Sequence, residues 1–220
     1  MIDRDQFQIE QTPVVPMPRH RPLEPDARGD GHRYIVAGNG VFLEVIRAWL
    51  HVIVRIGETE IALPFGNVTQ TVQFLCGPFP RLLLKDFRQQ AEAALPNETA
   101  ALIIWNKTTG EFRLLPTAVN ATPDRVNYVI PAFGEDEYRV VDIHSHGKLP
   151  AYFSSTDDAD DRHDVKIAVV IGTVDTEHVS IAARACILGK YLDLSEMLAT
   201  DLHLPTARET FYEPHVQTAA

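Results

Sequence analysis

The sequence predicts an α+β fold, in which a largely antiparallel or mixed β-sheet is flanked by helices and preceded by a β-rich extension. Two observations support this. Most apolar segments are short and rich in β-branched or aromatic residues, and a single segment has a clear helical period. With 220 residues, the chain is long enough for one ample domain, or for one domain with a smaller appended layer.

The first 78 residues are expected to form two different segments. Residues 1–30 contain five prolines among polar residues, which favours an extended Pro-rich arm that is ordered only where it lies against the body. Residues 31–78 contain the strand-like segments "RYIVAG" and "HVIVRIG" with the turn sequences "GNG" and "GETE". The segment "FLEVIRAWLHVIVRI" is also compatible with a helix, because its apolar residues recur at three or four positions, but strands are preferred.

The clearest helix follows in "RLLLKDFRQQAEAALP", where Leu83, Phe87, Ala91 and Ala94 form one apolar stripe and Pro96 ends the run. After it, "TAALIIWN" and "EFRLLPT" predict a β-hairpin. The segments "RVNYVIP", "YRVVDI", "DVKIAVVIGTV" and "HVSIAARACILG" predict further strands. A short helix is expected from Ser195, in front of a C-terminal tail at residues 196–220.

Composition argues against several classes of protein. The formal charge of −10 argues against a nucleic-acid-binding surface, which needs clustered Lys and Arg. No apolar run reaches 18 residues and no signal peptide is evident, so a cytoplasmic protein without membrane contact is expected. Cys76 and Cys186 lie in apolar surroundings without a nearby cysteine, and are predicted to be buried, reduced thiols rather than metal ligands.

Residues that can bind a metal ion are concentrated between Val140 and Asp161, in "VVDIHSHGKLPAYFSSTDDADD". The alternation of "YRVVDIHSH" puts His144 and His146 on the same face at the end of a strand, as two ligands of one metal require. Ser154 or Ser155 is a good N-cap, and a helix that begins there carries Asp157 in its first turn. Two imidazoles and one carboxylate leave a fourth position open, which is typical of catalytic zinc and not of Mg²⁺ or Ca²⁺ sites.

Each part of this pattern also has an ordinary structural interpretation. Two histidines in an HxH sequence are common surface or core residues, and "STDDADD" could be a solvated helix start; the conjunction of all four residues favours a metal site. Asp142 is expected either to hydrogen-bond a ligand histidine or to face solvent. The remaining acidic residues of the run are expected to be solvated in the first turn of the helix, or else to form a rim that attracts a basic peptide tail. The acidic residues concerned are Asp158, Asp160, Asp161 and Asp164. His163 is assigned to the surface, and Trp49 and Trp105 are assigned to the core.

The segment "HSHGKLPAYFSSTD" resembles the H-x-H-x7-S-x-x-D form of the JAMM motif of JAB/MPN-domain metalloproteases. The resemblance implies that His144, His146 and Asp157 hold one Zn²⁺ per chain, and that Ser154 lies beside the developing oxyanion. It also implies a JAB/MPN fold, which is similar to that of cytidine deaminases, over residues 79–195. Gly147 stands where the family often has proline.

The same family has a glutamate between its first helix and the following strand, and "AALPNETAALIIW" resembles that passage. Glu98, 46 residues before His144, is therefore predicted to be the general base. A strand-edge carboxylate without a catalytic role is the ordinary alternative, and Glu111 is the substitute candidate. The strand "TAALIIWN" lacks the glycines that many members carry here.

These residues together predict a zinc-dependent isopeptidase or peptidase that cleaves at the C-terminus of a ubiquitin-like protein or its conjugates. The N-terminal extension and "ILGKYLDL" resemble JAB-domain proteins of the PRTRC systems of bacterial mobile elements, whose gene sets also include ubiquitin-like and activating-enzyme-like members. The alternatives are a catalytically silent MPN scaffold, a DNA-associated JAB-domain protein, and a metallohydrolase barrel of the amidohydrolase type. Such barrels have about 250 residues and carry HxH near their start.

Overall fold

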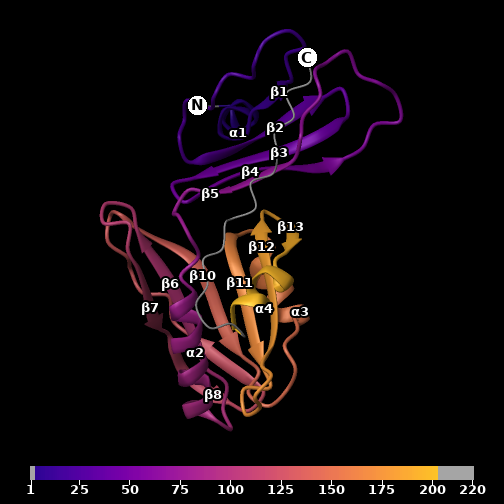
Figure 1. Cartoon of the computed structure of the whole chain (residues 1–220). Helices are drawn as coiled ribbons and strands as arrows, with labels where there is room; N and C mark the ends of the chain where they lie inside the picture. The colour runs from indigo at the N-terminus through magenta and orange to yellow at the C-terminus, as the bar shows by residue number, and fades with distance from the viewer. Residues whose placement is uncertain (1–2, 203–220) are drawn as a thin grey trace. The chain divides into compact units, whose positions relative to one another are not determined.

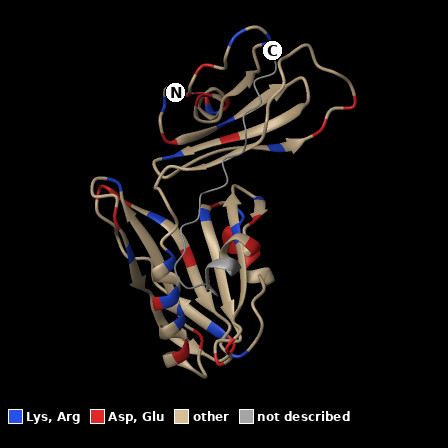
Figure 2. Ribbon diagram, in the orientation of Figure 1, with Lys and Arg blue, Asp and Glu red and all other residues tan. Residues whose placement is uncertain are grey.

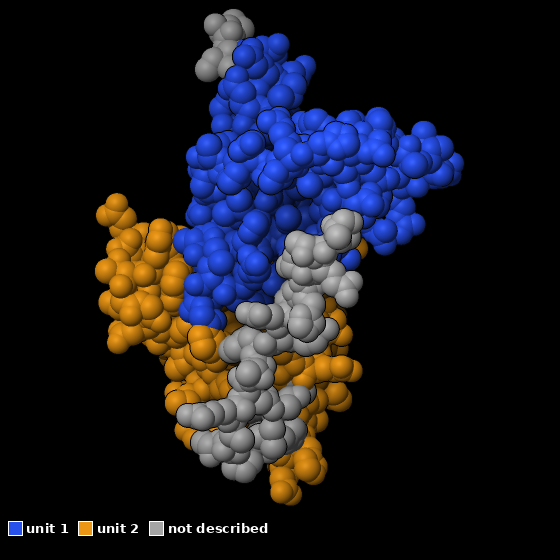
Figure 3. Space-filling view, turned by 45° about the horizontal axis from the view of Figure 1, so that its top comes forward, with its two compact units in different colours: residues 1–77, 211–220 blue, residues 78–210 orange. Residues whose placement is uncertain are grey.

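The computed structural model describes residues 3–202 and divides the chain into two compact units between Gly77 and Pro78 (Figures 1 and 3). The sequence predicted a boundary after residue 78, between a β-rich extension and the domain over 79–195. Each unit is described by itself.

The first unit is built on a five-stranded sheet with the order β1-β2-β3-β4-β5 (Figure 1). The strand β1 is parallel to β2, and the other neighbours are antiparallel. β3 and β4 form a hairpin across "FLEVIRAWLHVIVRI", which confirms strands over a helix in this segment. The bounds are β1 (Val14–Pro16), β2 (Gly31–Ala37), β3 (Gly40–Arg47), β4 (Leu50–Gly57) and β5 (Thr71–Phe74).

The N-terminal 30 residues differ from the extended arm that was predicted. Arg4–Gln11 forms a helix, α1, whose N-cap Asp3 accepts a hydrogen bond from the Asp5 N–H. The reason is that this segment precedes the first proline, Pro13, so nothing in it prevents helical backbone geometry. The residues that follow do lie against the body, since the Met17 N–H donates to the carbonyl of Val36 at 2.8 Å.

The second unit contains a six-stranded sheet with the order β13-β12-β11-β10-β6-β7. Only β10 and β11 are parallel, so the sheet is mixed, and the β6–β7 hairpin is confirmed. A separate hairpin, β8–β9, lies between β7 and β10 in the sequence. The bounds are β6 (Ala100–Asn106), β7 (Phe112–Pro116), β8 (Ala118–Thr122), β9 (Arg125–Tyr128), β10 (Glu137–Ser145), β11 (Val165–Gly172), β12 (Ser180–Ile187) and β13 (Lys190–Asp193).

Three helices accompany this sheet: α2 (Arg81–Ala94), α3 (Ser155–Asp161) and α4 (Ser195–Leu202). The helix predicted from the apolar stripe is α2, which buries Leu84, Phe87 and Ala91. α2 and α4 lie on the same face of the sheet (Figure 1). In residues 3–202 the strands form no parallel barrel, which excludes the amidohydrolase architecture.

The central strands β6 and β11 are buried along almost their whole length, which is why they are continuous apolar runs. Trp49 and Trp105 are buried as predicted, and both cysteines are free thiols. Cys186 is buried, whereas Cys76 is only partly buried. Among the described helices, none is both long and apolar enough to cross a bilayer. The predicted tail begins within α4, and its residues after Leu202 lie outside the described part.

Candidate metal centre

The structure brings His144, His146 and Asp157 together. One ligand atom from each lies within 4.8 Å of the other two. The Nε2 atoms of His144 and His146 are 3.2 Å apart, and Oδ1 of Asp157 is 3.7 Å from Nε2 of His144. This is the triad that the sequence pattern singled out.

The two histidines owe their placement to the strand period. His144 lies near the end of β10, and His146 follows its last residue, so both side chains leave the backbone on the same side. The His146 N–H donates to the Ile171 carbonyl at 2.9 Å, which continues the pairing with β11 past the end of the strand. The imidazole centroids are 5.1 Å apart as a result.

The carboxylate is placed by the start of α3, where Ser154 is the N-cap as predicted. Ser154 and Asp157 form a capping box. The backbone N–H and the hydroxyl of Ser154 both donate to Oδ2 of Asp157 at 2.7 Å. Because these bonds engage Oδ2, the other oxygen, Oδ1, is the one turned toward His144.

The donor set fits a zinc ion. Two atoms that each lie about 2.1 Å from one ion at a tetrahedral angle are about 3.4 Å apart, close to the separations found here. Burial lowers the pKa of His144 to about 4, so its imidazole is neutral and has a free lone pair at neutral pH. For His146, Nδ1 is 3.3 Å from the Pro150 carbonyl, which favours the tautomer with hydrogen on Nδ1 and a lone pair on Nε2.

Glu98 lies beside this centre, two residues before β6 begins, and is only 7% exposed. The neighbouring Thr99 exchanges two hydrogen bonds with Ser145 of β10: the Thr99 N–H donates to Oγ of Ser145 at 3.0 Å, and the Ser145 N–H donates to the Thr99 carbonyl at 2.9 Å. These bonds place the glutamate next to the strand end that carries the histidines.

The pKa of Glu98 is raised to about 7, first by burial and then by the negative charges of Asp124 and Asp157. A carboxyl group with this pKa can both take up and release a proton near neutral pH. Asp124 was not singled out from the sequence; its only signal was an acidic residue in the "TPDR" turn between β8 and β9.

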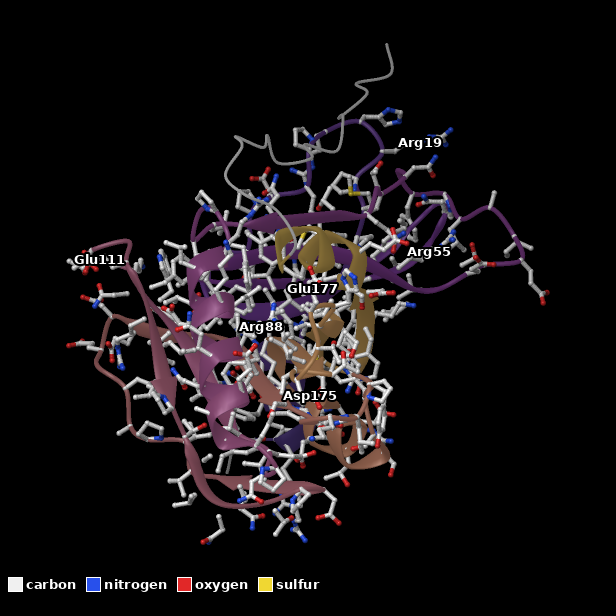
Figure 4. The ribbon with its side chains drawn as sticks, turned by 60° about the horizontal axis from the view of Figure 1, so that its bottom comes forward. Arg19, Arg55, Arg88, Glu111, Asp175 and Glu177 are labelled. Carbon is white, nitrogen blue, oxygen red and sulfur yellow. The ribbon has the colours of Figure 1, made fainter. Side chains whose placement is uncertain are left out.

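Glu111, the substitute candidate, is exposed in the turn between β6 and β7. β6 begins beside His144 with Ala100 and ends at Asn106, so this turn is at the opposite end of the hairpin from the metal centre. Figure 4 shows Glu111 at the edge of the molecule. Of the two glutamates, only Glu98 is placed at the centre.

Asp142 takes neither of its two predicted positions. It accepts hydrogen bonds from Nζ of Lys166 at 2.7 Å and from Nη1 of Arg139 at 3.3 Å. It therefore belongs to an ion-pair cluster with these two cations, in which its side chain is only 14% exposed, and it does not hydrogen-bond a ligand histidine.

Much of the acidic run belongs to the same cluster. Figure 2 shows the acidic residues of α3 and basic residues on the strands of the sheet. Asp161 is 3% exposed and bonds to Lys166 and Arg184, so the prediction that it is solvated is wrong. Arg184 also bonds Asp158 at 2.6 Å, while Asp164 pairs with Arg139. The cations lie on β10 (Arg139), β11 (Lys166) and β12 (Arg184), and no local pattern in the sequence pairs them with these carboxylates. Asp160 and His163 are exposed, as predicted.

Comparisons with known proteins agree with this division of the chain. Residues 80–186 match the family model of prokaryotic homologs of the JAB domain, and residues 3–75 match a domain of unknown function, DUF2016. A solved structure similar to part of the chain is the solution structure of protein DSY2949 from Desulfitobacterium hafniense. It is 16% identical, over 50% of this chain and 84% of that chain, with a TM-score of 0.38. No curated protein gives a significant match. The match over residues 80–186, which contain Glu98, both histidines and Asp157, supports the JAB/MPN family for the second unit.

Proposed function

We propose that the second unit is a zinc-dependent peptidase or isopeptidase of the JAMM type. The observation that carries the proposal is the triad of His144, His146 and Asp157, with a buried glutamate beside it whose pKa is about 7. A catalytically silent scaffold would need none of these groups to be in place.

In this proposal, zinc would be held by His144, His146 and Asp157, where it would polarise the scissile carbonyl and make a water molecule more acidic. Glu98 would take up a proton from the attacking water and later deliver it to the leaving amine. Ser154 holds Asp157 in the ground state. Its hydroxyl would turn from Asp157 toward the oxyanion as negative charge develops there, a contribution of a few kcal/mol in comparable sites.

The proposed substrate is the extended C-terminal segment of a ubiquitin-like protein or a conjugate of one. Tyr152 could make an apolar contact with such a segment. Its ring centroid lies 4.5 Å from that of His146, and the residue is 52% exposed. Activating-enzyme-like proteins of a PRTRC-type system are proposed as further partners. Nucleic acid is not proposed as a partner, because the chain has a formal net charge of −10.

The experiment that tests this function is cleavage of a fusion at the C-terminus of a ubiquitin-like protein. Wild-type protein should cleave the fusion, lose that activity when a chelator removes zinc, and regain it when zinc is added back. Cleavage that persists in the chelated protein, or in His144→Ala, would contradict the proposed mechanism. A zinc-loaded protein that never cleaves would favour the scaffold instead.

A further inference from the structure

The segment 147–151, which follows the ligand His146, is held against the ends of β11 and β12. The Thr173 N–H donates to the Leu149 carbonyl at 2.8 Å, and the Val174 N–H donates to the Gly147 carbonyl at 3.0 Å. Bonds of this kind, made between backbone groups, fix the course of the segment without regard to most of its side chains.

Ser180, the first residue of β12, provides a third attachment. Its Oγ accepts a hydrogen bond from the Ala151 N–H at 2.9 Å. The Ser180 N–H in turn donates to Oγ1 of Thr173 at 2.9 Å, which helps to hold the serine in place. The serine side chain therefore satisfies a backbone donor that the segment itself leaves without a partner.

Gly172, the last residue of β11, allows the segment to come this close. A Cβ atom at this position would lie 2.2 Å from the Leu149 oxygen, 2.4 Å from the Ala151 nitrogen and 2.5 Å from the Pro150 carbonyl carbon. All three are backbone atoms, so no side-chain rotation could relieve the overlap. Any residue other than glycine at 172 must displace the segment.

The position of the segment matters because its Pro150 carbonyl faces Nδ1 of His146 at 3.3 Å. A hydrogen bond to one ring nitrogen decides which tautomer is present and how the ring is oriented, and so decides whether the other nitrogen can bind a metal. Moving the segment would move the acceptor that holds this ring.

We propose that Gly172 and Ser180 are positioning residues for the metal ligand His146, acting through the backbone of residues 147–151 and the Pro150 carbonyl. This inference rests on the proposed zinc site. It adds two residues on β11 and β12, neither of which contacts the metal position.

The test is the zinc affinity of Gly172→Ala, Ser180→Ala and Ser180→Thr, measured by competition with a chromophoric chelator. Loss of an outer partner of a metal ligand typically weakens metal binding about 10- to 100-fold, and we expect a loss in this range for Gly172→Ala and at its lower end for Ser180→Ala. Ser180→Thr keeps the acceptor oxygen and should therefore retain most of the wild-type zinc affinity. The visible absorption of bound Co²⁺ should change in the two weakened variants, because it reports ligand geometry directly.

The matched control is Gly134→Ala, in the same unit, where a Cβ would meet Glu137 only at an ordinary 3.5 Å. Its zinc affinity should equal that of the wild type. Melting temperatures in the presence of a chelator separate a loss of metal binding from a loss of folding. If Gly172→Ala does not fold, the comparison of Ser180→Ala with Ser180→Thr decides.

Wild-type zinc affinity in Gly172→Ala and Ser180→Ala would overturn this inference while leaving the proposed function standing. A wild-type chain that binds no zinc would overturn both.

Discussion

Glu98→Gln should lower kcat for cleavage by about 100- to 10,000-fold, the usual contribution of a general acid–base group. The amide keeps the shape of the side chain but cannot accept a proton from the attacking water. Because Glu98 is not among the three candidate ligands, zinc binding should remain close to that of the wild type. The measurements are the rate of cleavage at saturating substrate and the zinc content of the same preparation.

Glu111→Gln is the matched control for this substitution. The sequence offered it as the alternative base, and it is exposed in the turn at the far end of the β6–β7 hairpin. Its kcat should be unchanged. Full activity in Glu98→Gln, or a large loss in Glu111→Gln, would show that the base has been wrongly assigned.

Lys166→Met should destabilise the second unit by about 3–5 kcal/mol, the usual cost of removing one partner from a buried ion pair. Lys166 is 3% exposed, and its Nζ lies 2.7 Å from Asp142 and 2.8 Å from Asp161. Methionine fills a similar volume but leaves buried carboxylates without their cation. Since Asp161 ends the short helix that begins with the Ser154–Asp157 capping box, zinc affinity should fall as well.

The free energy of unfolding is best measured by urea denaturation in a Trp49→Phe background. Trp105 is then the one tryptophan of the chain and reports on the second unit alone. Lys85→Met, an exposed lysine on α2, is the matched control and should change stability by less than about 0.5 kcal/mol. An equally small effect of Lys166→Met would mean that the cluster contributes nothing to the fold.

What could be predicted from the sequence depended on local patterns. The alternation in "YRVVDIHSH" placed His144 and His146 on one face, and the capping signal placed Asp157 in the first turn of α3. Glu98 came from the resemblance of the passage around it, and the structure adds the burial and the neighbouring charges that raise its pKa.

Features that depend on distant parts of the chain could not be predicted in this way. The acidic run beginning at Asp157 is typical of a solvated helix start, and only the folded sheet brings Arg184, 23 residues further along the chain, against Asp161. The need for glycine at position 172 likewise cannot be predicted from the sequence, because it depends on how closely the backbone of residues 147–151 approaches β11.

The most direct test of the central claim is the zinc content of the purified chain, measured by elemental mass spectrometry after dialysis against buffered zinc. Wild type and Glu98→Gln should each hold one zinc per chain, and His144→Ala should hold none under the same conditions. A wild-type chain without zinc, or a His144→Ala chain that keeps it, would contradict the metal centre on which the proposed function depends.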